Sequence, residues 1–87
     1  MEASMPTRFT YVYILESQST PDCYYIGVTG ALRERLLYHN AGSVPHTAKF
    51  IPWSIKLAVA LKDRPRALAL EKYLKTHAGR KFAKAHF

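Results

Sequence analysis

The sequence predicts an α+β fold in which a small antiparallel three-stranded sheet is flanked by helices, in the order strand, strand, helix, strand, helix. Residues 9–15 are mostly β-branched or aromatic and are apolar on both alternating faces, which is typical of a central strand covered on both sides. Residues 53–61 alternate with the period of a strand, and a segment of helical composition follows each of the last two strands.

The first half of the chain is predicted as a hairpin followed by a helix. Turn residues at 17–22 separate the first strand from a second strand at 23–28, and this spacing suits an antiparallel pair. The strand pattern breaks at Gly30, and residues 31–40 have helical composition. Gly42 marks the C-terminal end of this helix, because glycine adopts the left-handed conformation that is common there.

A third strand follows a loop. Residues 41–52 show no clear period and are predicted as a loop with room for one helical turn. In residues 53–61 the strict alternation places one apolar set on a single face and leaves the other face poorly buried. The apolar set consists of Trp53, Ile55, Leu57, Val59 and Leu61.

The C-terminal part is predicted as helical. Asp63 suits an N-cap and Pro65 suits the first turn, so a long helix is expected over residues 64–78. Gly79 is expected to end it. Residues 80–87 are expected to form a short basic terminal helix.

Length and composition limit the class of protein. The 87 residues form one domain, 1–87, in which residues 1–8 are expected to be a flexible N-terminus. A composition of 48% hydrophobic and 22% charged residues, with no apolar stretch long enough to cross a bilayer, excludes a membrane protein. The single cysteine, Cys23, cannot form an internal disulfide, and no secretory signal is visible, so a cytoplasmic location is expected. The cysteine and the four histidines lack the spacing of a structural zinc site.

Positive charge is concentrated in the second part of the chain. The net charge is +7; residues 1–34 carry two basic and four acidic side chains, whereas residues 35–87 carry eleven basic and two acidic ones. Such a field attracts polyanions, so nucleic acid is the leading candidate partner. A solvated basic face that serves only solubility is the alternative.

A carboxylate lies inside the apolar stripe of the long helix. On a helical wheel, Glu71 lies next to the direction of Ala78, on the same face as Ala67 and Leu74. A buried carboxylate has to be paired or has to hold a cation, because an isolated buried charge is costly. A structural salt bridge to an arginine and a functional site both satisfy this condition.

Polar and small residues also occupy core-facing positions elsewhere. Arg35 and His39 are four residues apart on one flank of the first helix, so they project together, although a snorkelling arginine and a satisfied core histidine are the alternative. Tyr11 and Tyr13 share one face of the first strand, and Tyr24 and Tyr25 take opposite faces of the second, so one tyrosine from each strand is expected to meet across the hairpin, although tyrosines in strands usually serve packing. Gly27 within a strand pattern indicates close approach of backbone or ligand.

These residues, taken in order, resemble the GIY-YIG nuclease domain over residues 9–87. The elements that carry the resemblance are Tyr11-Val12-Tyr13, Tyr25-Ile26-Gly27, Arg35, His39 and Glu71. In particular, the chain resembles the small standalone bacterial, excinuclease-like members, in which stretches like residues 38–42, His46-Thr47 and residues 71–75 recur. The resemblance implies an α+β domain that hydrolyses DNA phosphodiester bonds as an endonuclease with one divalent ion, Mg²⁺ or Mn²⁺.

The resemblance also implies roles for individual residues. Tyr13 matches the general base that takes a proton from the attacking water, and Tyr25 the residue that positions water or phosphate. Arg35 matches the arginine that clamps the scissile phosphate, where its planar fork suits two phosphate oxygens. His39 matches the partner of the base, and Glu71 the metal ligand, since a hard cation prefers oxygen.

The chain departs from the family pattern at two places. Tyr11 and Val12 replace the glycine and isoleucine of the first triplet, and both suit a central strand. Many members carry an asparagine about a dozen residues after the glutamate, and none occurs here after Asn40. Thr76 or His77 is the candidate replacement.

The substrate and partners follow from charge and resemblance together. We expect binding to DNA, including branched or damaged structures, with a link to repair or processing, and with targeting by a protein partner or self-association. The expected nucleic-acid contacts are Lys49, Lys72, Lys75, Arg80, Lys81 and Lys84. A non-catalytic nucleic-acid-binding module with a degenerate site is one alternative. A protein-binding adaptor anchored by Trp53 or Phe87 is another.

Overall fold

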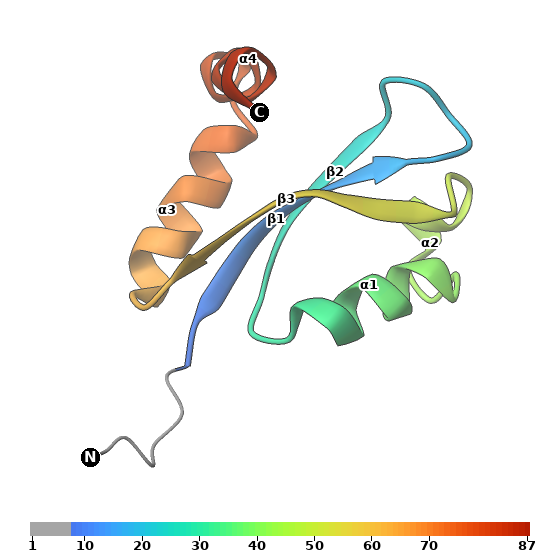
Figure 1. Ribbon diagram of the computed structural model, residues 1–87, viewed down its shortest axis with the longest axis horizontal. Helices are drawn as coiled ribbons and strands as arrows, with labels where there is room; N and C mark the ends of the chain where they lie inside the picture. The colour runs from blue at the N-terminus through green and yellow to red at the C-terminus, as the bar shows by residue number, and fades with distance from the viewer. Residues whose placement is uncertain (1–7) are drawn as a thin grey trace.

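The computed structural model describes residues 8–87 and contains a three-stranded antiparallel sheet with helices against it, as predicted (Figure 1). Apart from Arg8, the segment expected to be a flexible N-terminus lies outside the described residues. The elements are β1 Thr10–Ser17, β2 Tyr24–Thr29, α1 Leu32–Asn40, α2 Pro45–Ala48, β3 Trp53–Leu61, α3 Arg64–Leu74 and α4 His77–His86. The strand order is β2-β1-β3, so β1 is the central strand and the prediction is confirmed.

The side chains of β1 alternate between two separate apolar clusters. Val12 and Ile14 pack with Ala67 and Leu74, which belong to α3. Tyr13 and Leu15 point to the opposite face, where Trp53 and the apolar side of α1 pack against them. Figure 1 shows the corresponding arrangement, with α3 and α4 on one side of the sheet and α1 and α2 on the other. Burial on both faces explains why β1 is apolar throughout.

The third strand contains a bulge that the alternation did not reveal. Ile14 pairs with Leu57 but Leu15 pairs with Ile55, so Lys56 is an extra residue in β3. Side chains of paired residues lie on the same face of a sheet. The predicted single apolar face of β3 is therefore wrong: Ile55 lies on the face of α1, whereas Leu57 packs against the cluster under α3.

The predicted helix over residues 64–78 is also wrong, because α3 ends at Leu74 and a new helix begins at His77. Thr76 causes the break, since its Oγ1 accepts the N–H of Gly79 at 3.0 Å and donates to the carbonyl of Tyr73 at 2.6 Å. Gly79 therefore lies in the first turn of α4 and does not end α3. It packs directly on the Tyr73 carbonyl, where a Cβ has no room.

Trp53 holds α1 and α2 against the start of β3. Its backbone N–H donates to Asn40 Oδ1 at 2.6 Å, and its carbonyl accepts from Asn40 Nδ2 at 3.0 Å. Its indole Nε1–H donates to the Thr47 carbonyl at 3.0 Å. Trp53 is 4% exposed, so the prediction that it anchors a protein partner is wrong, whereas Phe87 is exposed.

Within residues 8–87, the helices are too short or too polar for any of them to cross a bilayer.

Replacement of Gly79 by alanine tests the close contact between α3 and α4. We expect Gly79→Ala to lower the free energy of unfolding by about 1–3 kcal/mol, because the new Cβ overlaps the Tyr73 carbonyl. Urea denaturation measures the change. Gly30→Ala is the matched control, since nothing lies within 4 Å of the position that a Cβ would take there, and it is expected to change stability by less than about 0.5 kcal/mol. Equal stability of the two variants contradicts the contact.

Candidate active site

Tyr13 occupies the centre of the sheet face that α1 covers. It is 1% exposed, and it pairs with Gly27 of β2 across the hairpin. A Cβ at Gly27 would lie 2.5 Å from the Tyr13 hydroxyl oxygen. Gly27 therefore provides the space in which this hydroxyl lies, which explains the glycine in the strand pattern.

The Tyr13 hydroxyl begins a chain of buried hydrogen bonds. It lies 3.3 Å from His39 Nε2, and His39 Nδ1 lies 2.9 Å from Thr47 Oγ1. Thr47 Oγ1 donates its only proton to the Val44 carbonyl at 3.3 Å. It therefore accepts from His39 Nδ1–H, which leaves Nε2 with a lone pair to accept the Tyr13 O–H. This chain fixes one tautomer of a neutral imidazole.

Burial sets the protonation states of the chain. It lowers the pKa of the His39 imidazole, and the positive charge of Arg35 lowers it further. Burial also raises the pKa of the Tyr13 phenol, and the interaction with Arg35 opposes that shift only in part. The nearby Tyr25 and the Glu71 carboxylate add to the increase. At neutral pH the pair is therefore a phenol that donates to a neutral imidazole.

Arg35 lies one helical turn before His39 on α1, as expected from their spacing. The attraction of the Tyr13 hydroxyl raises the pKa of its guanidinium, so this side chain remains a cation. Its Nε is buried and has no hydrogen-bond partner among the residues that the structure describes. A buried cationic donor without a partner is costly, and an anionic ligand that arrives at this place satisfies it.

Tyr25 extends the site toward solvent. Its ring centroid lies 6.3 Å from that of Tyr13 and 4.7 Å from that of His39, so the two predicted tyrosines do meet across the hairpin. Tyr25 is only partly buried, and it also lines an open cleft beside the site. It therefore connects the buried hydrogen-bond chain with the surface.

Glu71 approaches the site from α3 and is paired there with a neighbour. Its carboxylate lies 3.2 Å from Lys75 Nζ, one turn later, and its side chain is 23% exposed. The sequence left open a salt bridge or a functional site; the salt bridge that forms is with a lysine. Because Lys75 is half exposed, the pair is worth only about 0.3–0.5 kcal/mol. A stronger ligand for the carboxylate can displace the lysine.

The donor set fits a hard divalent cation that binds together with substrate. No cluster of three or more His, Cys, Asp or Glu side chains that could hold a metal occurs in residues 8–87. Mg²⁺ commonly takes one or two carboxylates and fills its other positions with water and substrate phosphate. Glu71 offers one such carboxylate, near enough to Tyr13 to affect the pKa of the phenol. Thr76, a candidate for the missing asparagine, instead caps α4.

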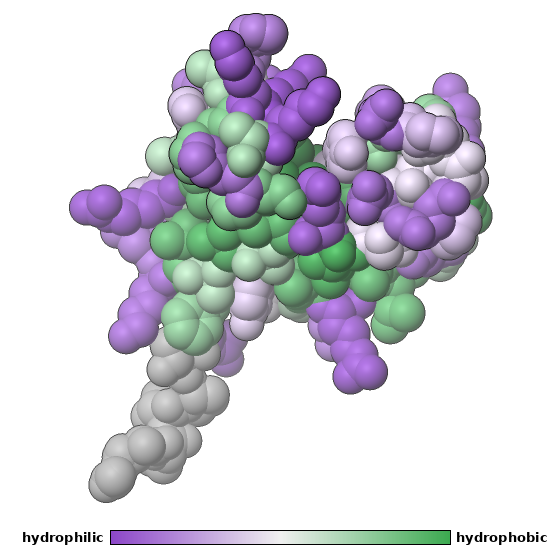
Figure 2. Space-filling view, turned by 45° about the horizontal axis from the view of Figure 1, so that its top comes forward, coloured by the Kyte–Doolittle hydropathy of each residue, from purple (hydrophilic) through white to green (hydrophobic). Residues whose placement is uncertain are grey.

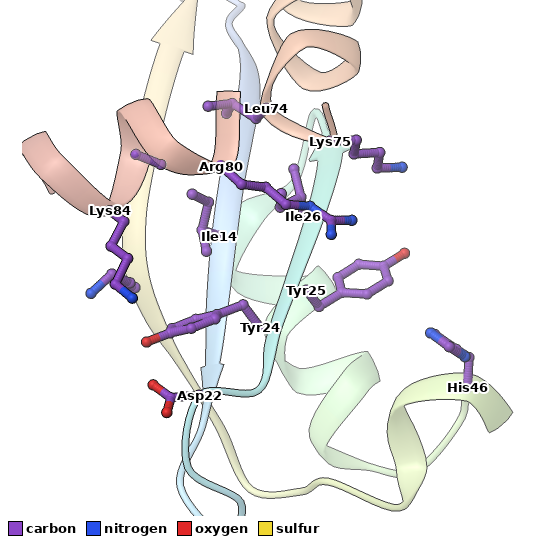
Figure 3. A pocket seen from close by; sticks show the side chains of 12 residues that line it. Ile14, Asp22, Tyr24, Tyr25, Ile26, His46, Leu74, Lys75, Arg80 and Lys84 are labelled. Carbon is purple, nitrogen blue, oxygen red and sulfur yellow. The ribbon is translucent and has the colours of Figure 1, made fainter. Parts of the chain in front are cut away.

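The basic residues are divided between a cleft and the open surface. A cleft of about 890 Å³ lies beside the site, and Lys75, Arg80 and Lys84 line it (Figure 3). The other predicted nucleic-acid contacts, Lys49, Lys72 and Lys81, are exposed but do not line this cleft. Lys56 does line it and was not predicted, because the bulge in β3 is invisible in the sequence.

Comparison with known proteins identifies the class. Residues 9–84 match the family model described as the GIY-YIG catalytic domain, so the chain belongs to the GIY-YIG family. This family consists in general of nucleases, typically endonucleases that depend on a divalent metal and act on nucleic acid. Searches of curated proteins and of solved structures gave no match.

Thr47 had no predicted role, although it lies next to His46 in a stretch quoted for the family resemblance. It is 1% exposed, and its side-chain oxygen orients His39. Its position depends on Trp53, whose indole holds the Thr47 carbonyl. Residues 41–52 are predicted mainly as a loop, where a threonine is ordinarily exposed, so the resemblance of His46-Thr47 to the family is the one sequence signal that could have identified it.

Removal of the Thr47 hydroxyl tests the imidazole tautomer. We expect Thr47→Val to leave His39 Nδ1–H without an acceptor, which costs about 1–3 kcal/mol of stability and removes the tautomer preference. The ¹⁵N chemical shifts of the two ring nitrogens measure this preference. Thr47→Ser keeps the hydroxyl and is expected to keep the shifts. Unchanged nitrogen shifts in Thr47→Val contradict the hydrogen-bond chain.

Stability should depend on pH through His39. Its pKa is lowered in the folded state, so the unfolded chain binds the proton more readily and stability is present above the ordinary value of about 6.5. Stability is lost as the pH falls from there toward the folded pKa, by at most about 1.4 kcal/mol per pH unit. Urea denaturation between pH 7.5 and pH 5 measures the slope. A His39→Gln variant is expected to show a flatter profile, and an identical profile contradicts the assignment.

Proposed function

We propose that the protein is a metal-dependent endonuclease that hydrolyses DNA phosphodiester bonds. The proposed catalytic residues are Tyr13, Tyr25, Arg35, His39 and Glu71, with Glu71 as the ligand of Mg²⁺ or Mn²⁺. The observation that carries the proposal is the buried Tyr13–His39–Thr47 hydrogen-bond chain beside an arginine nitrogen that has no partner among the described residues. Membership of the nuclease family supports it.

Tyr13 acts as a general base without becoming a stable phenolate. A phenol with a raised pKa is rarely ionised at neutral pH, so it cannot accept a proton unless it gives one away. His39 Nε2 accepts the Tyr13 proton while the phenol oxygen takes a proton from the attacking water. Thr47 holds Nδ1–H and stabilises the imidazolium that forms for that moment. The water oxygen, now hydroxide-like, attacks phosphorus, and the bond from phosphorus to the leaving sugar oxygen breaks. The leaving oxygen takes a proton from solvent water, and His39 returns to its neutral form by releasing the proton that it accepted.

Arg35 binds the scissile phosphate. Its guanidinium is a permanent cation that offers several N–H donors in one plane, and two phosphate oxygens match this geometry. The buried Nε gains the acceptor that it lacks among residues 8–87. As Arg35 turns from the Tyr13 hydroxyl to the phosphate, it uncovers this hydroxyl for the attacking water. Tyr25, the more exposed phenol, orients the water or a phosphate oxygen.

Glu71 holds the metal, which supplies charge neutralisation at the phosphate and at the leaving oxygen when it is bound. The carboxylate must leave Lys75 for this, and the weak exposed pair permits it. Lys75 then faces the cleft as a free cation, next to the incoming strand. The proposed setting is a cytoplasmic single domain that acts in DNA repair or processing on branched or damaged DNA. A partner or a second copy directs it to the target.

Loss of the Glu71 charge tests the proposal. We expect Glu71→Gln to reduce cleavage at least a hundredfold with Mg²⁺ or Mn²⁺, whereas Glu34→Gln, the same change on an exposed face of α1, leaves it within about twofold. A panel of linear, nicked, flapped and branched DNA, resolved on denaturing gels, measures cleavage. EDTA should abolish it. If the wild-type protein cleaves none of these substrates more than Glu71→Gln does, the result counts against an enzymatic function.

The proton relay predicts the effect of pH on rate. Activity should fall only at a pH below the ordinary imidazole pKa of about 6.5, because burial lowers the pKa of His39 in the folded protein and protonated His39 cannot accept the Tyr13 proton. Tyr13→Phe removes the relay and should lower the rate by about 10²-fold to 10⁴-fold. Single-turnover rates from pH 5.5 to 8.5 measure both effects. A residual activity of Tyr13→Phe with the pH profile of the wild type contradicts the relay.

A non-catalytic nucleic-acid-binding module is the second candidate, and the Glu71–Lys75 pair favours it because the pair partly neutralises the only carboxylate assigned to metal. The pH-rate and Glu71→Gln experiments separate the two. A module binds nucleic acid in a salt-dependent manner, with an affinity that does not respond to Tyr13→Phe or to metal. An endonuclease needs both the Tyr13 hydroxyl and the metal for efficient cleavage.

A further inference from the structure

The cleft beside the active site has an apolar floor and positively charged sides. Its floor is apolar, with Ile14 and Ile26 from the sheet and Leu74 and Ala83 from the helices. Its sides carry cations from three different elements. Figure 2 shows hydrophobic surface between the part that carries α4 and the hairpin, with hydrophilic side chains projecting around it. Such a combination fits a ligand that has both flat apolar groups and regularly spaced negative charges.

The cations line the cleft from end to end. Lys75 lies where α3 ends, Arg80 and Lys84 project from α4, and Lys56 comes from the bulge of β3. In Figure 3 the Arg80 side chain extends over Ile26 of β2, and Lys84 lies toward the end of the cleft that Tyr24 occupies. Among residues 8–87, Asp22 is the one carboxylate that lines it, so the balance of these residues is positive.

Tyr24 provides a flat aromatic surface at the far end. It is 46% exposed and lies on the opposite face of β2 from Tyr25. Lys56 Nζ lies 5.6 Å from the centroid of its ring, which is a cation–π contact that orients the ring. An exposed tyrosine beside cations offers a surface on which a base can stack.

The cleft and the active site form one continuous path. Tyr25 lines the cleft and also contacts His39. Lys75 lines the cleft and also pairs with Glu71. In Figure 3, Tyr24 and Tyr25 point in different directions from adjacent positions of β2, one into the cleft and one toward its outer edge. A chain bound along the cleft therefore reaches the catalytic residues at Tyr25.

We propose that this cleft binds an unpaired DNA strand, with a base stacked on Tyr24 and phosphates held by Lys56, Arg80 and Lys84. The proposal rests on the endonuclease function proposed above and adds the substrate feature that the site selects. The volume of about 890 Å³ is in the range of small-molecule pockets, which is enough for a few nucleotides of one strand and too little for a duplex. In a duplex the bases stack on each other and are not free to stack on a side chain.

The test compares binding of one labelled 12-nucleotide strand with binding of the same strand in a duplex. Fluorescence anisotropy is measured with EDTA present, so that no cleavage occurs. We expect Tyr24→Ala to weaken single-strand binding by about fivefold to a hundredfold, the effect of one lost stacking interaction, and duplex binding by less than twofold. Tyr24→Phe keeps the ring and should bind as the wild type does. Retained duplex binding by Tyr24→Ala excludes a folding defect as the cause of its weaker single-strand binding.

Lys56→Ala tests the electrostatic part. We expect it to reduce the slope of log K against log salt for the single strand by about 0.7, the value for one phosphate contact. Lys62→Ala is the matched control, since Lys62 is exposed just beyond β3 and does not line the cleft. Equal effects of the two variants overturn the assignment of Lys56.

Two further outcomes overturn the proposal. One is an equal effect of Tyr24→Ala on single strand and duplex. The other is competition by a poly-glutamate peptide of the same charge that matches competition by the unlabelled strand, which indicates a general anion surface. Failure of the proposed function looks different: Tyr24→Ala then weakens single-strand binding while the wild-type protein cleaves nothing. If cleavage requires Glu71 but Tyr24→Ala has no effect on binding, the endonuclease proposal stands and the proposal that the cleft binds an unpaired strand is overturned.

Discussion

The arrangement of the site depends on a tyrosine hydroxyl buried inside the sheet and on the glycine that leaves room for it. The Tyr13 hydroxyl has no access to bulk water, so it needs a partner inside the protein. His39 supplies this partner, Thr47 supplies the partner of His39, and the Val44 carbonyl ends the chain. Each group in this chain has the next group as its hydrogen-bond partner. Removal of any one group therefore leaves a buried donor or acceptor without a partner.

Structural residues hold this chain in place. Asn40 joins the end of α1 to the start of β3 through two hydrogen bonds with the backbone of Trp53, and the Trp53 indole holds the Thr47 carbonyl. The loop of residues 41–52 is thereby fixed at both ends, although its sequence shows no regular pattern. An imidazole in a buried hydrogen-bond chain needs such support because its tautomer, and not only its position, determines which nitrogen accepts a proton.

The acid and the cations lie on the other side of the sheet and meet the tyrosines at its edge. β2 is an edge strand, so Tyr25 and the end of α3 can approach the same opening from two faces. The weak Glu71–Lys75 pair lies at this opening. A carboxylate that is only partly buried and loosely paired is suited to exchange a lysine for a divalent ion, since the half-exposed lysine holds it weakly. The basic cleft continues from here along α4.

The sequence by itself determined the fold class and the central position of the apolar strand, and it provided the residues that are proposed for the site. Apolar alternation and glycine positions act locally, so the pattern of residues 9–15 and the position of Gly27 could be interpreted without coordinates. The bulge at Lys56, the break at Thr76 and the role of Thr47 came only from the tertiary structure. Each depends on which groups meet across the sheet or between helices, and a hydrogen bond or a register shift between distant segments leaves no periodic trace in the chain.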